Sequence, residues 1–225
     1  MAHENDKTPQ IEKSLSTILR KLKQKGSIDT ATFERIRPTG TTIPRLYGLP
    51  KVHKSGVPLR PILDMCNSPY HAVAKWLAGL LEPVRMTLTQ HSLNDTTGLI
   101  DALSGLNIKD RHMFSLDVTS LFTNVPIGET IDHLCTYNES NEIDVGLPID
   151  DLKEFLLFCT HDVQFKFNEE IYRQKDVVAM GSPLEALFAD VFMSKIENGP
   201  LKTHIKECVL YKRYVDDILC VVKIY

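Results

Sequence analysis

The feature that most restricts the fold is a pair of apolar-rich stretches, residues 208–214 and 218–223, with only a few residues between them. Both contain valine, leucine, isoleucine or tyrosine, and so short a connection predicts an antiparallel hairpin. Two adjacent carboxylates, Asp216 and Asp217, lie in this connection, where their mutual repulsion costs free energy. The sequence therefore predicts a hairpin whose tip is arranged to meet something positively charged.

Other hydrophobic patterns along the chain predict helices and further strands. Apolar residues recur at helical spacing in six segments, 11–24, 70–86, 93–103, 128–138, 149–159 and 184–197. Alternation of apolar and polar residues, or short extended pieces between glycines and prolines, predicts strands at 45–47, 59–63, 113–118 and in a hairpin at 163–174. This order indicates an α+β fold in which antiparallel strands are backed on one face by helices.

The strand at 113–118 carries a third carboxylate, Asp117, on the side opposite Phe114 and Leu116. If this strand lies beside the hairpin, three carboxylates meet, and they raise one another's pKa unless divalent cations bind between them. Oxygen ligands suit Mg²⁺ or Mn²⁺, and two such ions can align an attacking hydroxyl with a leaving phosphate oxygen. An aspartate pair taken alone is more often part of a solvated turn. Whether this pair binds metal ions therefore has to be judged from the surrounding sequence.

Composition excludes some classes of protein. No run of about 18 apolar residues occurs and the N-terminus is polar, so neither a membrane span nor a signal peptide is expected and the sequence predicts an intracellular protein. Five widely separated cysteines favour reduced thiols. The net charge of -3 hides an asymmetry, because residues 1–60 hold 12 basic against 5 acidic side chains and the rest hold 14 against 24. A basic N-terminal part suits a polyanion, although a solvated basic face is the commoner explanation.

Five blocks carry a resemblance to a known family. In chain order they are YGLPKVHK (47–54), PLRPI (58–62), SLDVTSLFTNVP (115–126), MGSPL (180–184) and YVDD (214–217). Together the blocks resemble those of a reverse transcriptase. In their exact residues they are similar to the blocks of Penelope-like retroelements, which are relatives of telomerase. The likeness covers about residues 40–225. Any single block would be weak evidence, whereas five in order are strong.

The resemblance implies an α+β fragment of a right-hand polymerase. Residues 1–39 would be a basic N-terminal helical extension and residues 40–105 a fingers-like region. Residues 106–225 would be a palm whose antiparallel strands are backed by helices and which ends after the YVDD hairpin, with the thumb absent.

The resemblance also implies the catalytic residues. Asp117, Asp216 and Asp217 would be catalytic. Asp117, the main-chain carbonyl of Val118 and Asp216 would bind two Mg²⁺ or Mn²⁺ ions, while Asp217 would shape the site and its charge. The family location would be nuclear.

Further positions match the nucleotide-binding blocks of the family. Lys51 or Lys54, together with Arg60, would contact the incoming triphosphate, where cations offset developing negative charge. The sequence does not choose between the two lysines. For Arg60, an ordinary surface ion pair is the alternative.

Phe122 would lie under the incoming sugar, where a bulky ring excludes a 2′-hydroxyl and favours deoxynucleotides; simple core packing is the alternative. Gly181 and Pro183 match the block beside the template base, although both residues also suit the start of a helix. Glu185 departs from the family pattern, which usually has a small serine at this place. Trp76 could stack a base, but its apolar neighbours favour core packing.

These expectations describe an RNA-directed DNA polymerase fragment that uses an RNA template, a DNA primer and dNTPs. The primer 3′-hydroxyl would attack the α-phosphate of the dNTP, and pyrophosphate would leave. A truncated chain of this kind has two alternatives: a catalytically inactive remnant that still binds nucleic acid through its basic part, or an unstable remnant without function.

Overall fold

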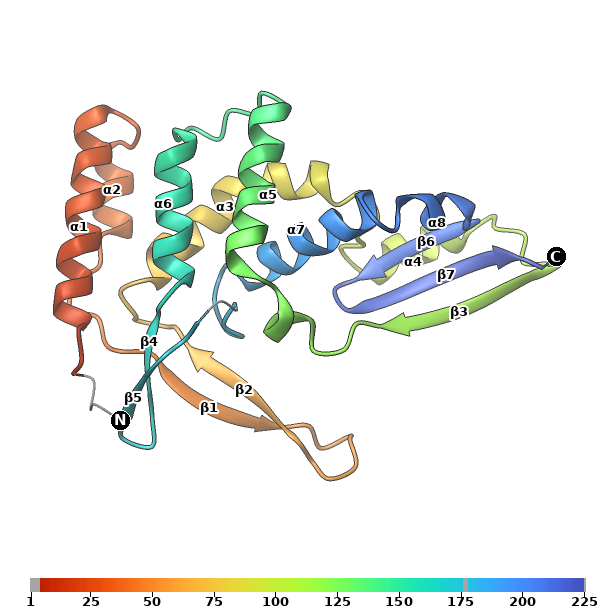
Figure 1. Cartoon of the computed structure of the whole chain (residues 1–225), viewed down its shortest axis with the longest axis horizontal. Coiled ribbons are helices and arrows are strands. Elements are labelled where there is room, and N and C mark those ends of the chain that lie inside the picture. Colours follow the sequence, from red (N-terminus) through yellow and green to blue (C-terminus); the bar gives the residue numbers. More distant parts are fainter. Residues whose placement is uncertain (1–4, 176–177, 225) are drawn as a thin grey trace.

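The computed structural model describes residues 5–175 and 178–224 (Figure 1). The helices in this part of the chain are α1 (Thr8–Lys25), α2 (Thr30–Ile36), α3 (His71–Leu88), α4 (Thr96–Leu103), α5 (Ile127–Ser140), α6 (Ile149–Thr160), α7 (Glu185–Asn198) and α8 (Lys202–Glu207), with one 3₁₀ turn, η1 (Leu121–Asn124). The strands are β1 (Arg45–Pro50), β2 (Leu59–Asp64), β3 (Arg111–Asp117), β4 (Gln164–Phe167), β5 (Glu170–Arg173), β6 (Leu210–Tyr214) and β7 (Asp217–Lys223). The fold is α+β, as predicted.

The strands form two separate sheets. One has the order β3-β7-β6 and is antiparallel throughout, as the sequence predicted for the strands that carry the aspartates. The other has the order β2-β1-β4-β5, and within it β1 and β4 run parallel, with Arg45 opposite Lys166. The β4–β5 hairpin therefore joins the β1–β2 hairpin, although more than 90 residues separate them in the sequence, and Figure 1 shows both hairpins below the helices.

Local sequence explains where the helices begin and end. In α1, Pro9 occupies the first turn, where a missing N–H costs nothing, and Gly26 ends the helix with a φ of 80°. Asp95 caps α4 by accepting a hydrogen bond from the Gly98 amide. The helices α2 and α8 were not predicted because they have only 7 and 6 residues, too few to show a helical period.

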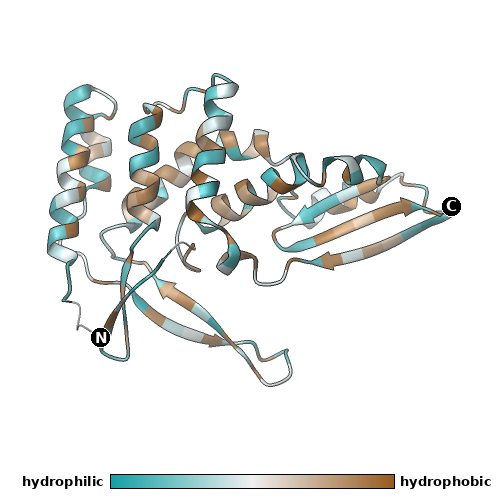
Figure 2. Cartoon of the chain, viewed as in Figure 1, coloured by the Kyte–Doolittle hydropathy of each residue, from teal (hydrophilic) through white to brown (hydrophobic). Residues whose placement is uncertain are grey.

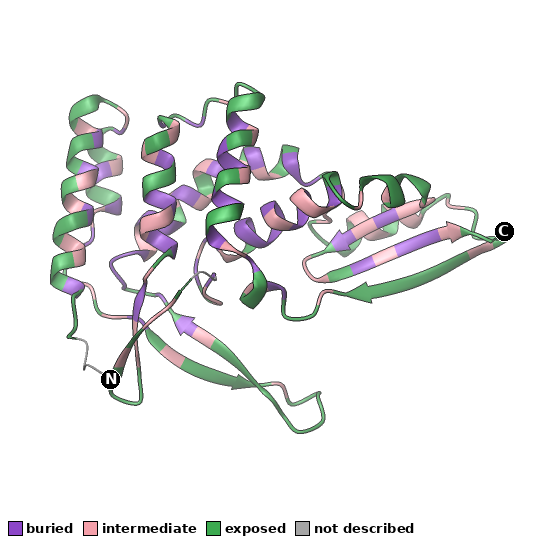
Figure 3. Cartoon of the chain, in the orientation of Figure 1, coloured by how far each residue is buried: buried purple, intermediate pink, exposed green. Residues whose placement is uncertain are grey.

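The core lies between the helices. The helices α3 and α7 pack against each other, and α5 packs against both α6 and α7. Their buried faces are mainly apolar, although α7 also buries Asp190, Ser194 and Glu197, and hydrophilic residues lie on the outer turns (Figure 2). The strand β3 is an exception: it lies at a sheet edge and is drawn as exposed along almost its whole length in Figure 3, with Leu116 51% exposed.

None of the helices within residues 5–175 and 178–224 has the length and hydropathy needed to cross a membrane.

Candidate active site

The antiparallel sheet brings the predicted catalytic aspartates to one end. Asp117 is the last residue of β3 and lies directly opposite Asp217, the first residue of β7. Tyr214, the last residue of β6, is the partner of Asp217 on its other side. Because directly paired residues of neighbouring strands point to the same face, Asp117, Asp217 and Tyr214 form one row across that face. All three are exposed, whereas the next residue along β7, Ile218, is buried on the opposite face.

Asp216 lies in the two-residue turn that follows Tyr214, and this turn is fastened to the end of β3. The amide of Val118 donates a hydrogen bond to the carbonyl oxygen of Asp216 at 2.9 Å. The main chain after Asp117 is thus in direct contact with the turn that carries Asp216, so the strand of Asp117 does lie beside the hairpin. Within the described residues, however, no three histidine, cysteine, aspartate or glutamate side chains are gathered closely enough to hold a metal ion.

The donors at this tip nevertheless suit the expected ions. Carboxylates of Asp117 and Asp216 and the carbonyl of Val118 are hard oxygen ligands, the type that Mg²⁺ and Mn²⁺ prefer. The protein would supply only three oxygen ligands here, two side-chain carboxylates and one main-chain carbonyl, which is fewer than in a metal site enclosed by protein. This is typical of Mg²⁺ sites, where substrate phosphates and water complete the shell.

The turn itself has an unusual backbone. Val215 has a φ of 56°, in the left-handed region that a β-branched side chain rarely adopts. Such conformations cost on the order of 1–3 kcal/mol and persist only where the surroundings hold them. A nearby side chain does so here, because Arg213 Nη1 donates a hydrogen bond to the Val215 carbonyl oxygen at 3.1 Å.

Arg213 belongs to a buried ion network that sequence reasoning missed. Its side chain is fully buried and contacts two carboxylates of α7, with Nε 2.7 Å from Glu197 Oε1 and Nη1 2.8 Å from Asp190 Oδ1. Asp190 is also paired with Arg85 of α3 at 2.6 Å. Burial opposes the charged form of Arg213, but the hydrogen bonds and charges of Glu197 and Asp190 outweigh it and raise its pKa.

This network, Arg213 with Glu197, Asp190 and Arg85, ties β6 to α7 and α3 next to the turn at residues 214–217. One sequence signal could have revealed it. Asp190 and Glu197 are seven residues apart in the segment predicted as a helix, so they share one helix face, together with the apolar Leu187 and Met193 and with Ser194. Two buried acids on one face require a cation from elsewhere.

The cations predicted to contact the triphosphate lie on the other hairpin. Lys51 and Lys54 are in the β1–β2 connection, where the Lys51 amide bonds to the Pro58 carbonyl at 2.9 Å and the Lys54 amide to the Lys51 carbonyl at 3.0 Å. Arg60 is exposed on β2, opposite Leu49. In the described part of the chain none of the three forms an ion pair, so the surface ion pair considered for Arg60 is not found.

Gly181 lies against β2. Its φ is 105°, and an added Cβ would be 2.3 Å from the carbonyl oxygen of Leu63, so a side chain is excluded. The Leu63 amide bonds to the Met180 carbonyl at 2.8 Å, which fixes the same contact. The absence of a side chain at residue 181 is thus explained by contact with the chain's own strand. Pro183, half-buried, precedes α7 by two residues.

Glu185, the residue that departs from the family pattern, adds a hydrogen bond to Gly181 at the contact between Gly181 and β2. Its Oε2 accepts a hydrogen bond from the Gly181 amide at 2.7 Å. Burial raises the pKa of Glu185, while the Gly181 amide and the charge of Arg60 act in the opposite direction. Glu185 therefore has a hydrogen-bond partner within the chain, the Gly181 amide, and its carboxylate is also influenced by the charge of Arg60.

Phe122 follows β3 on the 3₁₀ turn η1 rather than on a strand. Its side chain is partly buried and packs against the hydrophobic core. The preceding Ser120 has a φ of 56°, so the chain turns sharply between Asp117 and Phe122. This placement agrees with the core-packing alternative, and a role for the ring beneath a sugar stays a prediction.

The comparisons with known proteins identify the family. Residues 52–224, about three quarters of the chain, match the family described as reverse transcriptase (RNA-dependent DNA polymerase). The chain therefore belongs to the reverse transcriptase family. A search of curated proteins found no match.

Solved structures with the same fold include telomerases and a viral polymerase. Telomerase from Candida albicans, in complex with a fragment of telomeric RNA, matches with a TM-score of 0.63 and 13% identity, covering 92% of this chain and 42% of that one. Apo telomerase from Candida tropicalis, truncated from its C-terminal domain, matches with a TM-score of 0.57 and 15% identity over 80% and 44%. An RNA polymerase complex inside a dsRNA virus matches with a TM-score of 0.55 and 10% identity over 96% and 22%. The chain thus spans less than half the length of these structures.

Proposed function

We propose that the chain is the fingers and palm part of an RNA-directed DNA polymerase of the Penelope-like type, which adds dNTPs to a DNA primer on an RNA template. The observation that carries the proposal is the pairing of Asp117 with Asp217, together with the hydrogen bond from Val118 to the Asp216 carbonyl. Two carboxylate-bearing blocks that are far apart in the sequence lie side by side there. Family membership and the fold shared with telomerase, solved with telomeric RNA, support a nucleic-acid template.

In this proposal Asp117, Asp216 and the Val118 carbonyl hold two Mg²⁺ or Mn²⁺ ions. When bound, such ions lower the pKa of the primer hydroxyl and neutralise charge on the phosphates. Asp217, in the same row as Asp117, adds negative charge that favours cations at the tip. The exposed position of the row leaves it open to a primer end and a nucleotide.

The fingers cations would hold the triphosphate. Neither Arg60 nor Lys51 or Lys54 forms an ion pair among the described residues, so the charges of Arg60 and one of the lysines remain available for phosphate. Arg60 also lies near Glu185, whose bond to Gly181 links β2 to the start of α7. Gly181 and Pro183, at this junction between β2 and the start of α7, would lie beside the template base. Phe122 would exclude a nucleotide that carries a 2′-hydroxyl.

Arg213 is a positioning residue in this scheme. It contacts no reacting atom, but its bond to the Val215 carbonyl holds the main chain between Tyr214 and Asp216 in a conformation that valine disfavours. The direction of the Asp216 side chain depends on that conformation.

The test is primer extension on poly(rA)/oligo(dT) with Mg²⁺ or Mn²⁺, run with this chain and with a C-terminally extended chain. We expect Asp216→Asn and Asp117→Asn to lower incorporation about 1,000-fold or more, because a lost metal ligand removes most of the transition-state stabilisation. Asp101→Asn, an exposed aspartate of α4, is the matched control. Equal incorporation by Asp216→Asn and the unchanged chain would refute the proposal. Salt-dependent nucleic-acid binding without incorporation, unaffected by Asp216→Asn, would select an inactive nucleic-acid-binding domain instead.

A further inference from the structure

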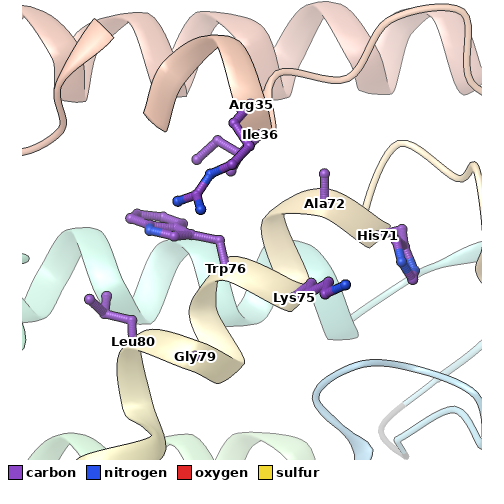
Figure 4. Close-up of a pocket in the computed structure, with 8 residues that line it drawn as sticks. All are labelled: Arg35, Ile36, His71, Ala72, Lys75, Trp76, Gly79 and Leu80. Carbon is purple, nitrogen blue, oxygen red and sulfur yellow. The ribbon is translucent and has the colours of Figure 1, made fainter. Parts of the chain in front are cut away.

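A pocket between α2 and α3 is separate from the carboxylate row. It has a volume of about 720 Å³, within the range of ligand-binding sites, and Figure 4 shows side chains of both helices lining it. Its lining includes the apolar side chains of Ile36, Ala72 and Leu80 and the ring of Trp76. Figure 1 places α2 at the opposite end of the molecule from the β6–β7 hairpin.

The charged side chains that line the pocket are both basic. Arg35 and Lys75 are exposed lining residues, and among the described residues neither is in an ion pair. Among the described residues, no carboxylate lines the pocket. The pKa of Asp29 is lowered mainly by hydrogen bonds from Thr32 and least by the charge of Arg35. An anionic ligand would meet two available cations here.

Two further residues of the lining, His71 and Trp76, carry aromatic rings. His71 Nδ1 is buried and has no hydrogen-bond partner there. Trp76 is half-buried, with its ring edge-on to Phe155 at 6.4 Å between centroids and 85° between planes, so it is anchored in the core on one side. On its other side the indole lies in the pocket, where Arg35 points toward it from the facing helix (Figure 4).

We propose that this pocket binds a single-stranded nucleic-acid segment, with one base stacked on Trp76 and the adjoining phosphates paired with Arg35 and Lys75. Every base has a flat face that an indole can stack, and cations beside an aromatic ring are the usual means of holding a single strand. An apolar peptide helix fits less well, because it would cover two cations without neutralising them. The excess of basic residues in positions 1–60 gives this end of the chain the matching charge.

The chain provides its own reporter for this site. Trp76 is its only tryptophan, so intrinsic tryptophan fluorescence reports on the pocket alone. Short oligo(rU) and oligo(dT), added in EDTA, should quench this fluorescence in a saturable way that weakens as salt is raised. Inorganic phosphate at the same phosphate concentration should leave it unchanged, because phosphate cannot stack.

Three variants and one control sharpen the test. Arg35→Glu and Lys75→Glu should each weaken oligonucleotide binding and lower the salt slope by about 0.7 to 1, the share of one phosphate contact. Trp76→Ala should weaken binding by about 5- to 100-fold, followed by the anisotropy of a labelled oligonucleotide. Lys206→Glu changes the charge equally on an exposed residue of α8 and should have less effect.

Two results would overturn the inference. One is oligonucleotide binding, seen by anisotropy, that leaves the fluorescence of Trp76 unchanged. The other is a loss of affinity in Lys75→Glu, whose exposed side chain is not needed for folding, no larger than that in Lys206→Glu. Both are measured in EDTA without dNTPs, so absence of primer extension would count against the proposed polymerase and not against this site.

Discussion

The two hairpins of the candidate site are held in opposite ways. The tip of the β6–β7 hairpin is bonded to other parts of the chain, through Val118 to the Asp216 carbonyl and through the buried Arg213 to the Val215 carbonyl. The tip of the β1–β2 hairpin is exposed, and its backbone hydrogen bonds at residues 51–58 are made within the tip itself. The aspartates therefore lie on a hairpin whose tip is held in place by the rest of the chain. Lys51 and Lys54 lie on a hairpin tip with few buried contacts, which can change its conformation more easily.

The largest effect should come from breaking the support of the first hairpin. Arg213→Met leaves Glu197 and Asp190 as buried acids without this cation, so we expect a loss of about 3–5 kcal/mol in the free energy of unfolding. Urea denaturation measures it. Arg213→Lys keeps the charge but not the planar set of donors, so it should lower kcat for dNTP incorporation more than it raises the KM for dNTP.

A second substitution distinguishes positioning from stability alone. Glycine adopts a φ of 56° without cost, so Val215→Gly needs less help from Arg213. In the Arg213→Lys background, Val215→Gly should restore part of the lost rate. If Val215→Gly lowers the rate equally in both backgrounds, Arg213 does not act through this turn.

The next largest effect concerns the junction between the two halves of the site. Gly181→Ala forces a Cβ against the Leu63 carbonyl and strains a φ of 105°, so the contact between β2 and the start of α7 must open. We expect a loss of about 1–3 kcal/mol in unfolding free energy, measured by urea denaturation. Gly79→Ala, in α3 with open space around its Cβ, is the control and should be neutral or stabilising. Equal stabilities of the two variants would contradict the junction.

The exposed hairpin should show a purely functional effect. Arg60→Ala should raise the KM for dNTP about 10-fold, the usual size of one lost charge-assisted contact, while unfolding free energy stays within about 0.5 kcal/mol because the side chain is exposed. Lys51→Ala and Lys54→Ala, compared in the same assay, identify the lysine that contacts the triphosphate. A change in stability without a change in KM would indicate a structural role for Arg60.

The smallest effect is a pH dependence at the junction. Because burial raises the pKa of Glu185 above its ordinary value of 4.5, the folded state binds a proton more tightly than the unfolded state. Stability from this group is fully present below pH 4.5 and is lost as the pH rises through the folded pKa. Glu185→Gln, whose amide oxygen still accepts from Gly181, should flatten stability above pH 4.5, as followed by thermal unfolding across that range. If the pH dependence of stability is the same in both proteins, the folded-state pKa of Glu185 is not raised.

Much of the local structure was predictable, and most of what was missed depends on distant contacts. The periods of residues 11–24 and 70–86 predicted α1 and α3 closely, and the hairpin at 163–174 was also confirmed. Its parallel pairing with β1 was not predicted, since periodicity does not tell which distant strand a hairpin joins. At the site, the hairpin with Asp216 and Asp217 followed from the local pattern, whereas the pairing of β3 with β7 was only a conditional expectation and the role of Arg213 was missed.

Residues close together in the chain were enough to predict the family motifs, the helices of ten residues or more and the hairpin that carries the paired aspartates, because helical periods and tight turns are local features. Three features appear only in the folded chain: β4 lies beside β1, Gly181 touches β2, and Arg213 is enclosed by Glu197 and Asp190. These contacts join segments far apart in sequence. Their free energy comes from burial and from the pairing of charges away from water, and neither exists until the chain has packed.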